Sequence, residues 1–286
     1  MNDVRRPVFA GSWYPADARE CRAEIETFLE SGPGADLRPG SWIGGIVPHA
    51  GWYYSGSIAC NVIACLKEPD PVDVVVLFGM HLHPASANYL MPRGTWHTPL
   101  GDLPVATGLA DYMTQRFDFQ KETARRFSQD NTIELQLPFV KALLEPAAVL
   151  ALGVPPAPIA IEIGRAAAQW ALENKQRIKV IGSTDLTHYG RNYGFLPHGS
   201  GRAALEWVRH ENDRRVIDAM LALTPAKIID EGLDHQNACC AGAAAAAVAA
   251  AVQLGAREGR TLAYATSHDK SPGESFVGYA GVLFGA

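Results

Sequence analysis

The chain has 286 residues but lacks any apolar run long enough to cross a membrane. Its longest bland stretch, AGAAAAAVAAAV, has 12 residues and is mostly alanine, whereas a transmembrane helix needs about 20 apolar residues. The chain also lacks a basic surplus, since its formal net charge is −5, and the first residues contain no apolar segment of signal-peptide type. We therefore expect a cytoplasmic protein that binds neither nucleic acid nor membranes.

Cysteine is scarce, and the common catalytic signatures are absent. Five cysteines occur, at positions 21, 60, 65, 239 and 240, and no two of them form a CxxC pair. An odd number without a disulfide-type spacing predicts reduced thiols, and Cys60 and Cys65 fall within a predicted helix, where we expect them in the core. The chain contains no P-loop, no G-x-G-x-x-G, no G-x-S-x-G and no H-E-x-x-H motif, so none of these functions is predicted.

The pattern of apolar residues predicts an α/β fold. Hydrophobic residues make up 48% of the chain, enough for one large core. Short apolar runs rich in β-branched residues predict strands at 42–47, 73–78, 148–154, 178–183, 261–267 and 275–284. Helical patterns lie at 17–30, 56–66, 107–117, 131–144, 158–173, 200–221, 224–231 and 240–254. We expect a single layered domain, 1–286, with a mostly parallel or mixed central sheet and helices on both faces. No helix follows 275–284, so this run is predicted to be antiparallel.

Histidine, aspartate and cysteine recur where these strands end. In open α/β sheets, ligands bind beyond the carboxyl ends of the strands, and loops at one sheet edge converge in space. The residues at such positions are His49 after 42–47, His81 and His83 after 73–78, Asp185 and His188 after 178–183, and Cys240 at the start of helix 240–254. Any single loop histidine is usually solvated, but the joint pattern predicts a shared pocket.

Such a set suits a metal ion. Two histidines and one anionic ligand with open positions suit non-haem Fe(II), while a thiolate shifts the preference towards softer metals, including Cu(I) and Zn. Cys240 opens a helix, whose N-terminus lowers the pKa of a thiol; the alternative is a small buried cysteine in a small-residue helix. The neighbouring Cys239 is expected to point elsewhere.

Two further segments carry acidic residues with a possible role. Asp185 precedes His188 by three residues, so the two can face one cavity and act as a general acid/base pair. The alternative is a capping aspartate with an exposed histidine. In SQDNTIELQLPF, Asp130 or Asn131 caps a helix whose first turn holds Glu134, which is structural and can also support the cavity.

Seven blocks, taken together, resemble the Memo family, whose prokaryotic members are also called AmmeMemoRadiSam system protein B. They are AGSWYPAD, PHAGWYYSG, TPLGDLPV, TIELQLPF, STDLTHYG, NACCAG and ESFVGYAG, and they extend over nearly the whole chain. The resemblance implies a fold similar to the class III extradiol dioxygenases, which hold Fe(II) with two histidines and a carboxylate and cleave catechol rings with O₂. It also implies that His49, His81 and Cys240 form the metal site, with Asp185 and His188 lining the same pocket.

Two departures from the family pattern leave alternatives open. The loop GMHLH is one residue shorter than the usual one, so that His83 is an alternative ligand to His81. Asn131 stands where the family often carries a histidine and is expected to face the pocket.

Three functions follow as hypotheses. The first is an Fe(II)- or Cu-dependent redox enzyme acting on a small, possibly aromatic diol flanked by Trp52 and Tyr53, with Fe(II) preferred and Cu or Zn as alternatives. The second is a binding protein of the signalling or metal-handling type that uses the same cleft for a peptide, a metal ion or another small molecule. The third is hydrolysis by a metal-bound water. The sequence leaves the oligomeric state open.

Overall fold

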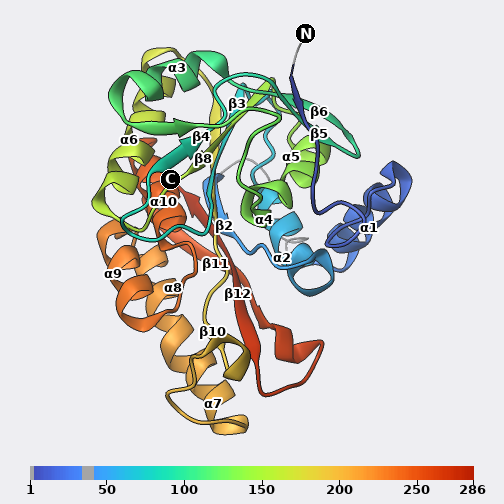
Figure 1. Ribbon diagram of the computed structural model, residues 1–286, viewed down its shortest axis with the longest axis vertical. Coiled ribbons are helices and arrows are strands. Elements are labelled where there is room, and N and C mark those ends of the chain that lie inside the picture. Colours follow the sequence, from blue (N-terminus) through green and yellow to red (C-terminus); the bar gives the residue numbers. More distant parts are fainter. Residues whose placement is uncertain (1–2, 34–41) are drawn as a thin grey trace.

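The fold is organised around a nine-stranded sheet in a computed structural model that describes residues 3–33 and 42–286 (Figure 1). The strands run across the sheet in the order β10 (His188–Tyr189), β12 (Phe276–Gly285), β2 (Trp42–Val47), β9 (Ile178–Ser183), β3 (Val74–Gly79), β8 (Ala148–Gly153), β4 (Asn88–Leu90) and β7 (Phe119–Lys121), while β11 (Glu258–Thr266) pairs with β12. The sheet is mixed, as predicted.

The parallel centre of the sheet comprises β2, β9, β3 and β8. Their residues are almost all buried, which is why each reads as a continuous apolar run. The last strand, β12, lies antiparallel to β2, with Val282 opposite Ile46, which confirms the expectation for the run that no helix follows. Because the four central strands are parallel, their carboxyl ends meet at one edge.

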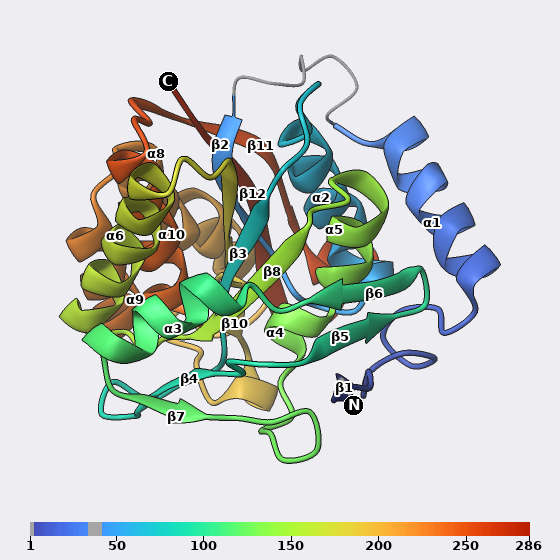
Figure 2. The same cartoon turned by 90° about the horizontal axis from the view of Figure 1, so that it is seen from above.

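Helices cover both faces of the sheet (Figure 2). On one side lie α1 (Ala18–Ser31), α2 (Trp52–Cys65) and α5 (Leu137–Leu143), and on the other α6 (Pro158–Glu173), α8 (Asp213–Leu221), α9 (Pro225–His235) and α10 (Ala241–Gln253). The alanine-rich α10 packs so closely on α6 that a Cβ at Gly164 would lie 2.1 Å from the carbonyl oxygen of Ala246. The small residues that look bland in the sequence thus allow close packing of these helices.

Two predicted helices are interrupted. The segment 131–144 forms α4 (Asn131–Glu134) and α5, because Pro138, the second residue of α5, has no amide hydrogen to donate to the carbonyl one turn earlier. The segment 200–221 forms α7 (Arg202–Trp207), a π-helical segment (Val208–Asn212) and α8. The predicted helix 107–117 is α3 (Thr107–Arg116).

The sequence patterns did not reveal a small second sheet. It consists of β1 (Val4–Arg5), β5 (Thr95–Thr98) and β6 (Gly101–Pro104), which are two to four residues long and too short to show a periodic pattern. Among the described residues, no helix is both long and apolar enough to span a bilayer.

Candidate metal centre and adjoining pocket

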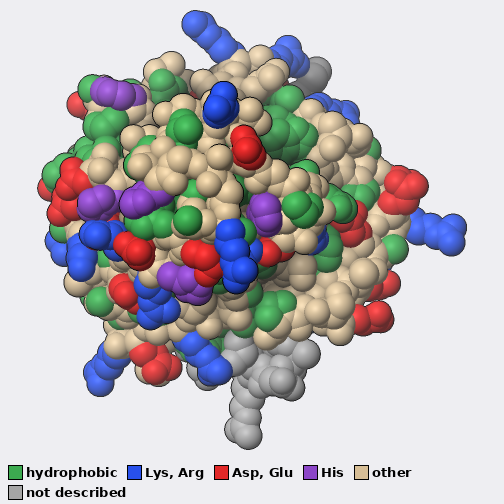
Figure 3. All heavy atoms as spheres, turned by 90° about the horizontal axis from the view of Figure 1, so that it is seen from below, with side chains coloured by type: hydrophobic (Ala, Val, Ile, Leu, Met, Phe, Trp, Pro, Cys, Tyr) green, Lys and Arg blue, Asp and Glu red, His purple; other side chains and the backbone are tan. Residues whose placement is uncertain are grey.

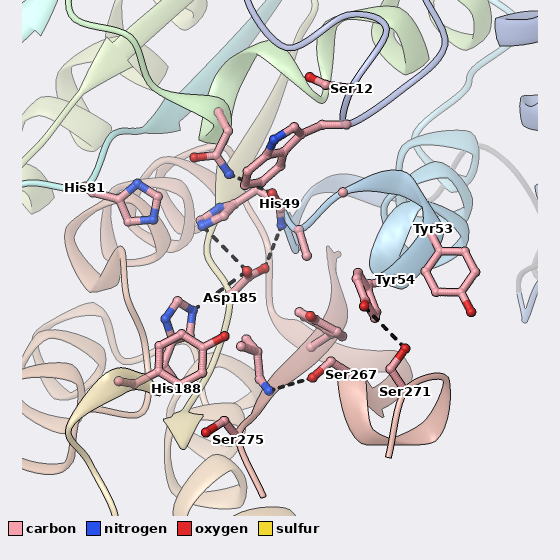
Figure 4. Close-up of a pocket in the computed structure, with 17 residues that line it drawn as sticks. Ser12, His49, Tyr53, Tyr54, His81, Asp185, His188, Ser267, Ser271 and Ser275 are labelled. Atoms are coloured by element: carbon pink, nitrogen blue, oxygen red, sulfur yellow. Dashed lines mark hydrogen bonds and ion pairs between the residues drawn. The ribbon is translucent and has the colours of Figure 1, made fainter. Parts of the chain in front are cut away.

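Three adjacent strands position the first site residues. His49 follows β2, His81 follows β3 and Asp185 follows β9, and these strands are neighbours in the sheet. Figure 4 shows His49 and His188 directed at Asp185, with His81 beside them. The convergence predicted from the strand ends is therefore present.

Four donor groups form a compact cluster (the His/Cys cluster): His49, His81, Cys239 and Cys240, whose ligand atoms all lie within 4.8 Å of one another. Cys239 Sγ is 3.3 Å from His49 Nε2 and 3.8 Å from Cys240 Sγ. The rings of His49 and His81 meet edge to face, with centroids 4.9 Å apart. The three predicted ligands thus share one site with a fourth group.

Cys239 differs from its expectation. The sequence predicts that it points elsewhere than Cys240, but the backbone at Cys240 is not extended (φ −128°, ψ 53°), so neighbouring side chains need not point to opposite sides. The Cys239 amide donates to the Asp185 carbonyl at 3.1 Å, and the Cys240 amide donates to Thr184 Oγ1 at 3.0 Å. These two bonds tie both cysteines to the end of β9, so that both sulfurs reach the cluster.

In each cluster histidine, Nδ1 contacts a polar group of another residue. The Ser183 hydroxyl donates to the Thr132 carbonyl at 2.7 Å, so its oxygen accepts from His49 Nδ1 at 3.0 Å. In its neutral form, His49 therefore carries its proton on Nδ1 and directs the lone pair of Nε2 at the cluster. The Nδ1 of His81 lies 3.0 Å from the Asp130 carboxylate. Partners of this kind orient histidine ligands at metal sites.

Without a metal, the pKa values of the two cysteine thiols shift in opposite directions. Burial disfavours the thiolate of Cys239, but the hydrogen bond from Cys240 and the neighbouring His49 and His188 hold its pKa well below the usual value. Burial and the neighbouring Cys239 thiolate raise the pKa of Cys240. The low thiol pKa expected for Cys240 from its helix position is therefore found at Cys239 instead.

The cluster histidines have raised pKa values. Burial opposes the charged form of His49, yet Asp185 and the Cys239 thiolate outweigh it and raise the pKa of His49. For His81, burial is outweighed by hydrogen bonds to Asp130 and Cys239, which raise its pKa to about 10. Anionic groups next to both rings create a place that favours positive charge, including that of a metal cation.

A pocket of about 610 Å³ adjoins the cluster. Its lining combines aromatic rings and hydroxyl groups with site residues: Ser12, Trp13, His49, Ala50, Gly51, Tyr53, Tyr54, His81, Asn131, Asp185, His188, Tyr193, Ser267, Ser271, Ser275, Val277 and Tyr279. In Figure 4 the tyrosines of α2 and the serines of the β11–β12 turn lie across the pocket from the histidines. None of these lining residues is Lys or Arg, and three of them are histidines.

Asp185 and His188 meet at the pocket wall. Asp185 Oδ1 accepts the His49 amide at 2.7 Å, and its Oδ2 lies 3.9 Å from Nε2 of both His49 and His188. Burial opposes protonation of His188, but Asp185 and Cys239 prevail and raise its pKa to about 9. His188 lines the pocket and its side chain is one-third exposed.

The other predicted pocket residues divide into two groups. Tyr53 and Asn131 line the pocket, and the Asn131 amide donates to the His49 carbonyl at 2.8 Å. Trp52 does not: it is 1% exposed, stacks on Phe139 at 4.1 Å, and belongs to the core because it points inward from α2. His83 also lies outside both the pocket lining and the cluster; it is exposed and accepts the Ala85 amide.

Glu134 does not line the pocket. Its carboxylate accepts the amides of Val8 and Phe9 at 2.7–2.9 Å and the Tyr14 hydroxyl at 3.2 Å. It therefore holds the N-terminal loop whose Trp13 reaches the pocket. The sequence did not predict four aromatic pocket residues: Trp13, Tyr54, Tyr193 and Tyr279. The clustering of aromatics in SWYP and WYYSG was a signal for the first two, and none marked the other two.

The outer surface at the end formed by α7 and the β11–β12 turn carries mixed charges. Figure 3 shows histidine side chains there among both basic and acidic residues, without a continuous patch of one sign. This agrees with the composition, which gives no basic footprint.

Comparison with known proteins assigns the family. Residues 5–283 match the family of Memo-like proteins. MEMO1 family proteins of Methanopyrus kandleri and Methanosarcina acetivorans are 33% and 32% identical, each over 98% of this chain and 98–99% of their own length. An uncharacterised Escherichia coli protein of known crystal structure shares the fold, with a TM-score of 0.54, 14% identity and coverage of 85% of this chain and 99% of its own. The chain belongs to the Memo family.

Proposed function

We propose that this protein is a metal-dependent redox protein whose metal ion is held by His49, His81 and Cys240 and whose substrate is a small aromatic diol. The observation that carries the proposal is the convergence of these side chains within 4.8 Å at the carboxyl edge of the sheet, beside a pocket of about 610 Å³.

The donors fit a metal on chemical grounds. Both histidines have their Nδ1 engaged by another group, which leaves Nε2 for an ion. Two imidazoles and one anionic ligand with open positions suit Fe(II), and the thiolate makes Cu and Zn the alternatives. When bound, such an ion supplies Lewis acidity and, for Fe or Cu, one-electron chemistry.

The protein residues would then bind the substrate and move its proton. The aromatic rings of the pocket present flat surfaces to a ring, and the serine and tyrosine hydroxyls offer hydrogen bonds to its oxygens. His188, with its raised pKa and its carboxylate neighbour Asp185, would hold or release a proton at the pocket wall.

A second function, metal handling without turnover, is favoured by one specific observation. Cys239 adds a fourth donor at 3.3 Å from His49 Nε2. A fully protein-ligated ion leaves no position for substrate.

The deciding experiment measures metal content after anaerobic purification and then O₂ consumption with a panel of catechols. About one iron per chain with catechol-dependent O₂ uptake, both lost in His49→Ala, would support the redox enzyme. Stoichiometric metal without any uptake would favour metal handling. A metal-free protein whose His49→Ala variant keeps all its ligand binding would exclude both.

A further inference from the structure

The two cysteine sulfurs of the His/Cys cluster are spaced as ligands of one tetrahedral ion. The edge of a tetrahedron is about 1.6 times its centre-to-corner distance, so two sulfurs bound to one Zn(II) at about 2.3 Å lie about 3.8 Å apart. In the structure, Cys239 Sγ and Cys240 Sγ are 3.8 Å apart.

The sulfur–nitrogen spacing agrees as well. A sulfur and an imidazole nitrogen on the same Zn(II) lie about 3.5 Å apart, and Cys239 Sγ lies 3.3 Å from His49 Nε2. The farthest donors in the cluster are within 4.8 Å. The longest of these spacings has to shorten by roughly 1 Å when Zn(II) binds, and His81, with a side chain 42% exposed, is the most exposed of the four donors.

Cys239 is also accessible from a second pocket. It lines a second pocket of about 330 Å³, together with Leu186, His188, Tyr193, Gly232, Gln236 and Ala238. This pocket shares only His188 and Tyr193 with the larger one. An ion can therefore approach the sulfur without passing through the proposed substrate pocket.

We propose that Cys239 is a fourth metal ligand, which gives this chain a closed two-histidine, two-cysteine site for Zn(II). The proposal rests on the metal centre proposed above at His49, His81 and Cys240, and adds a ligand to it. On binding, each cysteine coordinates as a thiolate and any thiol proton passes to solvent, with no change of oxidation state. Four protein donors fill a tetrahedral shell, so the Zn(II) form excludes a diol from the ion.

Absorption of bound Co(II) tests the proposal directly, because Co(II) replaces Zn(II) in tetrahedral sites and shows a separate sulfur-to-metal charge-transfer band for its thiolates. Wild type, Cys239→Ser and Cys240→Ser would be titrated with Co(II) and then Zn(II) under a phosphine reductant. Cys65→Ala is the matched control, since it removes a buried thiol on α2. Thermal unfolding of every variant shows whether it is folded.

For wild type we expect tetrahedral Co(II) bands with two-thiolate charge transfer. Cys239→Ser should lose about half of the charge-transfer intensity and bind Zn(II) at least ~100-fold more weakly, beyond what loss of an outer-shell partner costs. Cys65→Ala should match wild type. Fe(II) binding should survive in Cys239→Ser and be lost in Cys240→Ser.

The outcomes separate the two proposals. Unchanged charge transfer and Zn(II) affinity in folded Cys239→Ser would overturn the fourth ligand and leave the three-residue centre standing. Wild-type protein that binds neither Co(II) nor Fe(II) would overturn the metal centre itself, and the fourth ligand with it.

Discussion

At the scale of single residues, one hydroxyl group determines which nitrogen of His49 faces the candidate metal centre. Ser183 gives its proton to the Thr132 carbonyl, so it accepts from His49 and fixes the tautomer of that ring. Asp185 adds a second constraint by accepting the His49 amide at 2.7 Å. Both residues belong to β9 or follow it directly, so one strand end orients a ligand that comes from another strand.

Asp185→Asn is expected to weaken metal binding by about 10–100-fold, because it removes the negative charge next to His49 and His188 while leaving the donor atoms in place. The measurement is a competition titration with a chromophoric chelator. Asp102→Asn is the matched control, since Asp102 also contacts a histidine, His97, at 2.6 Å, but on the separate small sheet. Equal affinity in the two variants would contradict the role given to Asp185.

The sequence predicted the positions of His49, His81 and Asp185 because each directly follows a buried strand, and such strands are easy to recognise. It did not separate His81 from His83. The choice depends on Met80, whose left-handed backbone (φ 74°) redirects the chain after β3, and no sequence pattern reveals a positive φ at methionine. The orientation of Cys239 depends on the local backbone at Cys240 (φ −128°, ψ 53°), which the sequence does not reveal.

At the scale of elements, α8 is fastened to the end of the sheet by a buried carboxylate. Asp213, the first residue of α8, accepts the Thr187 amide at 3.0 Å and the Tyr264 hydroxyl at 2.7 Å. Gly278 of β12 leaves room for it, since a Cβ there would lie 2.0 Å from Asp213 Oδ2. Asp213 thereby joins α8, β11 and the strand end that carries His188.

Burial raises the pKa of Asp213 to about 6, although Thr187 and Tyr264 donate hydrogen bonds to it. Between about pH 4 and pH 6 the folded protein therefore holds a proton that the unfolded chain has lost. The free energy of unfolding should fall as the pH rises through this window, by on the order of 2–3 kcal/mol from this group alone.

Asp213→Asn should flatten this fall, since an amide does not titrate. Urea unfolding at several pH values from 4 to 7 measures the effect. Asp218→Asn, on the same helix but exposed and paired with Arg214 at 2.7 Å, should keep the wild-type slope. A wild-type slope in Asp213→Asn would show that Asp213 is ionised throughout.

The main elements were predictable, and the small ones were not. Each of the six expected strands coincides with an observed strand to within a few residues, because five of them are almost entirely buried and so form continuous apolar runs; the sixth, β11, is mostly half-buried. The strands β4, β7 and β10 have two or three residues, and their pairing depends on partners far away in the chain. The local sequence does not indicate which distant segment a short strand pairs with.

At the scale of the whole molecule, the N-terminal loop completes a pocket built mostly from later segments. Glu134 holds this loop across 120 to 126 positions of sequence, through the amides of Val8 and Phe9 and the hydroxyl of Tyr14. The loop in turn brings Ser12 and Trp13 to the pocket. The pocket thus depends on a contact that lies outside it.

Glu134→Gln is expected to lower the free energy of unfolding by about 1–3 kcal/mol, because one acceptor oxygen becomes a donor that faces amides. It should also weaken binding of an aromatic ligand while leaving metal stoichiometry unchanged. Denaturant unfolding, tryptophan fluorescence on ligand titration and metal analysis give the three readouts. Glu68→Gln serves as control, since it alters a pair with Lys179 away from the pocket lining. Loss of metal in Glu134→Gln would contradict the separation between loop and metal centre.

His188 and Tyr193 line both pockets, whereas Cys239 lines only the smaller one. For the metal centre proposed above, an ion would then reach Cys239 from the smaller space while an organic ligand occupies the larger one. A chelator or a metal donor would act from that side without displacing the ligand. Metal loading of the protein would in that case follow the surrounding metal supply independently of its ligand.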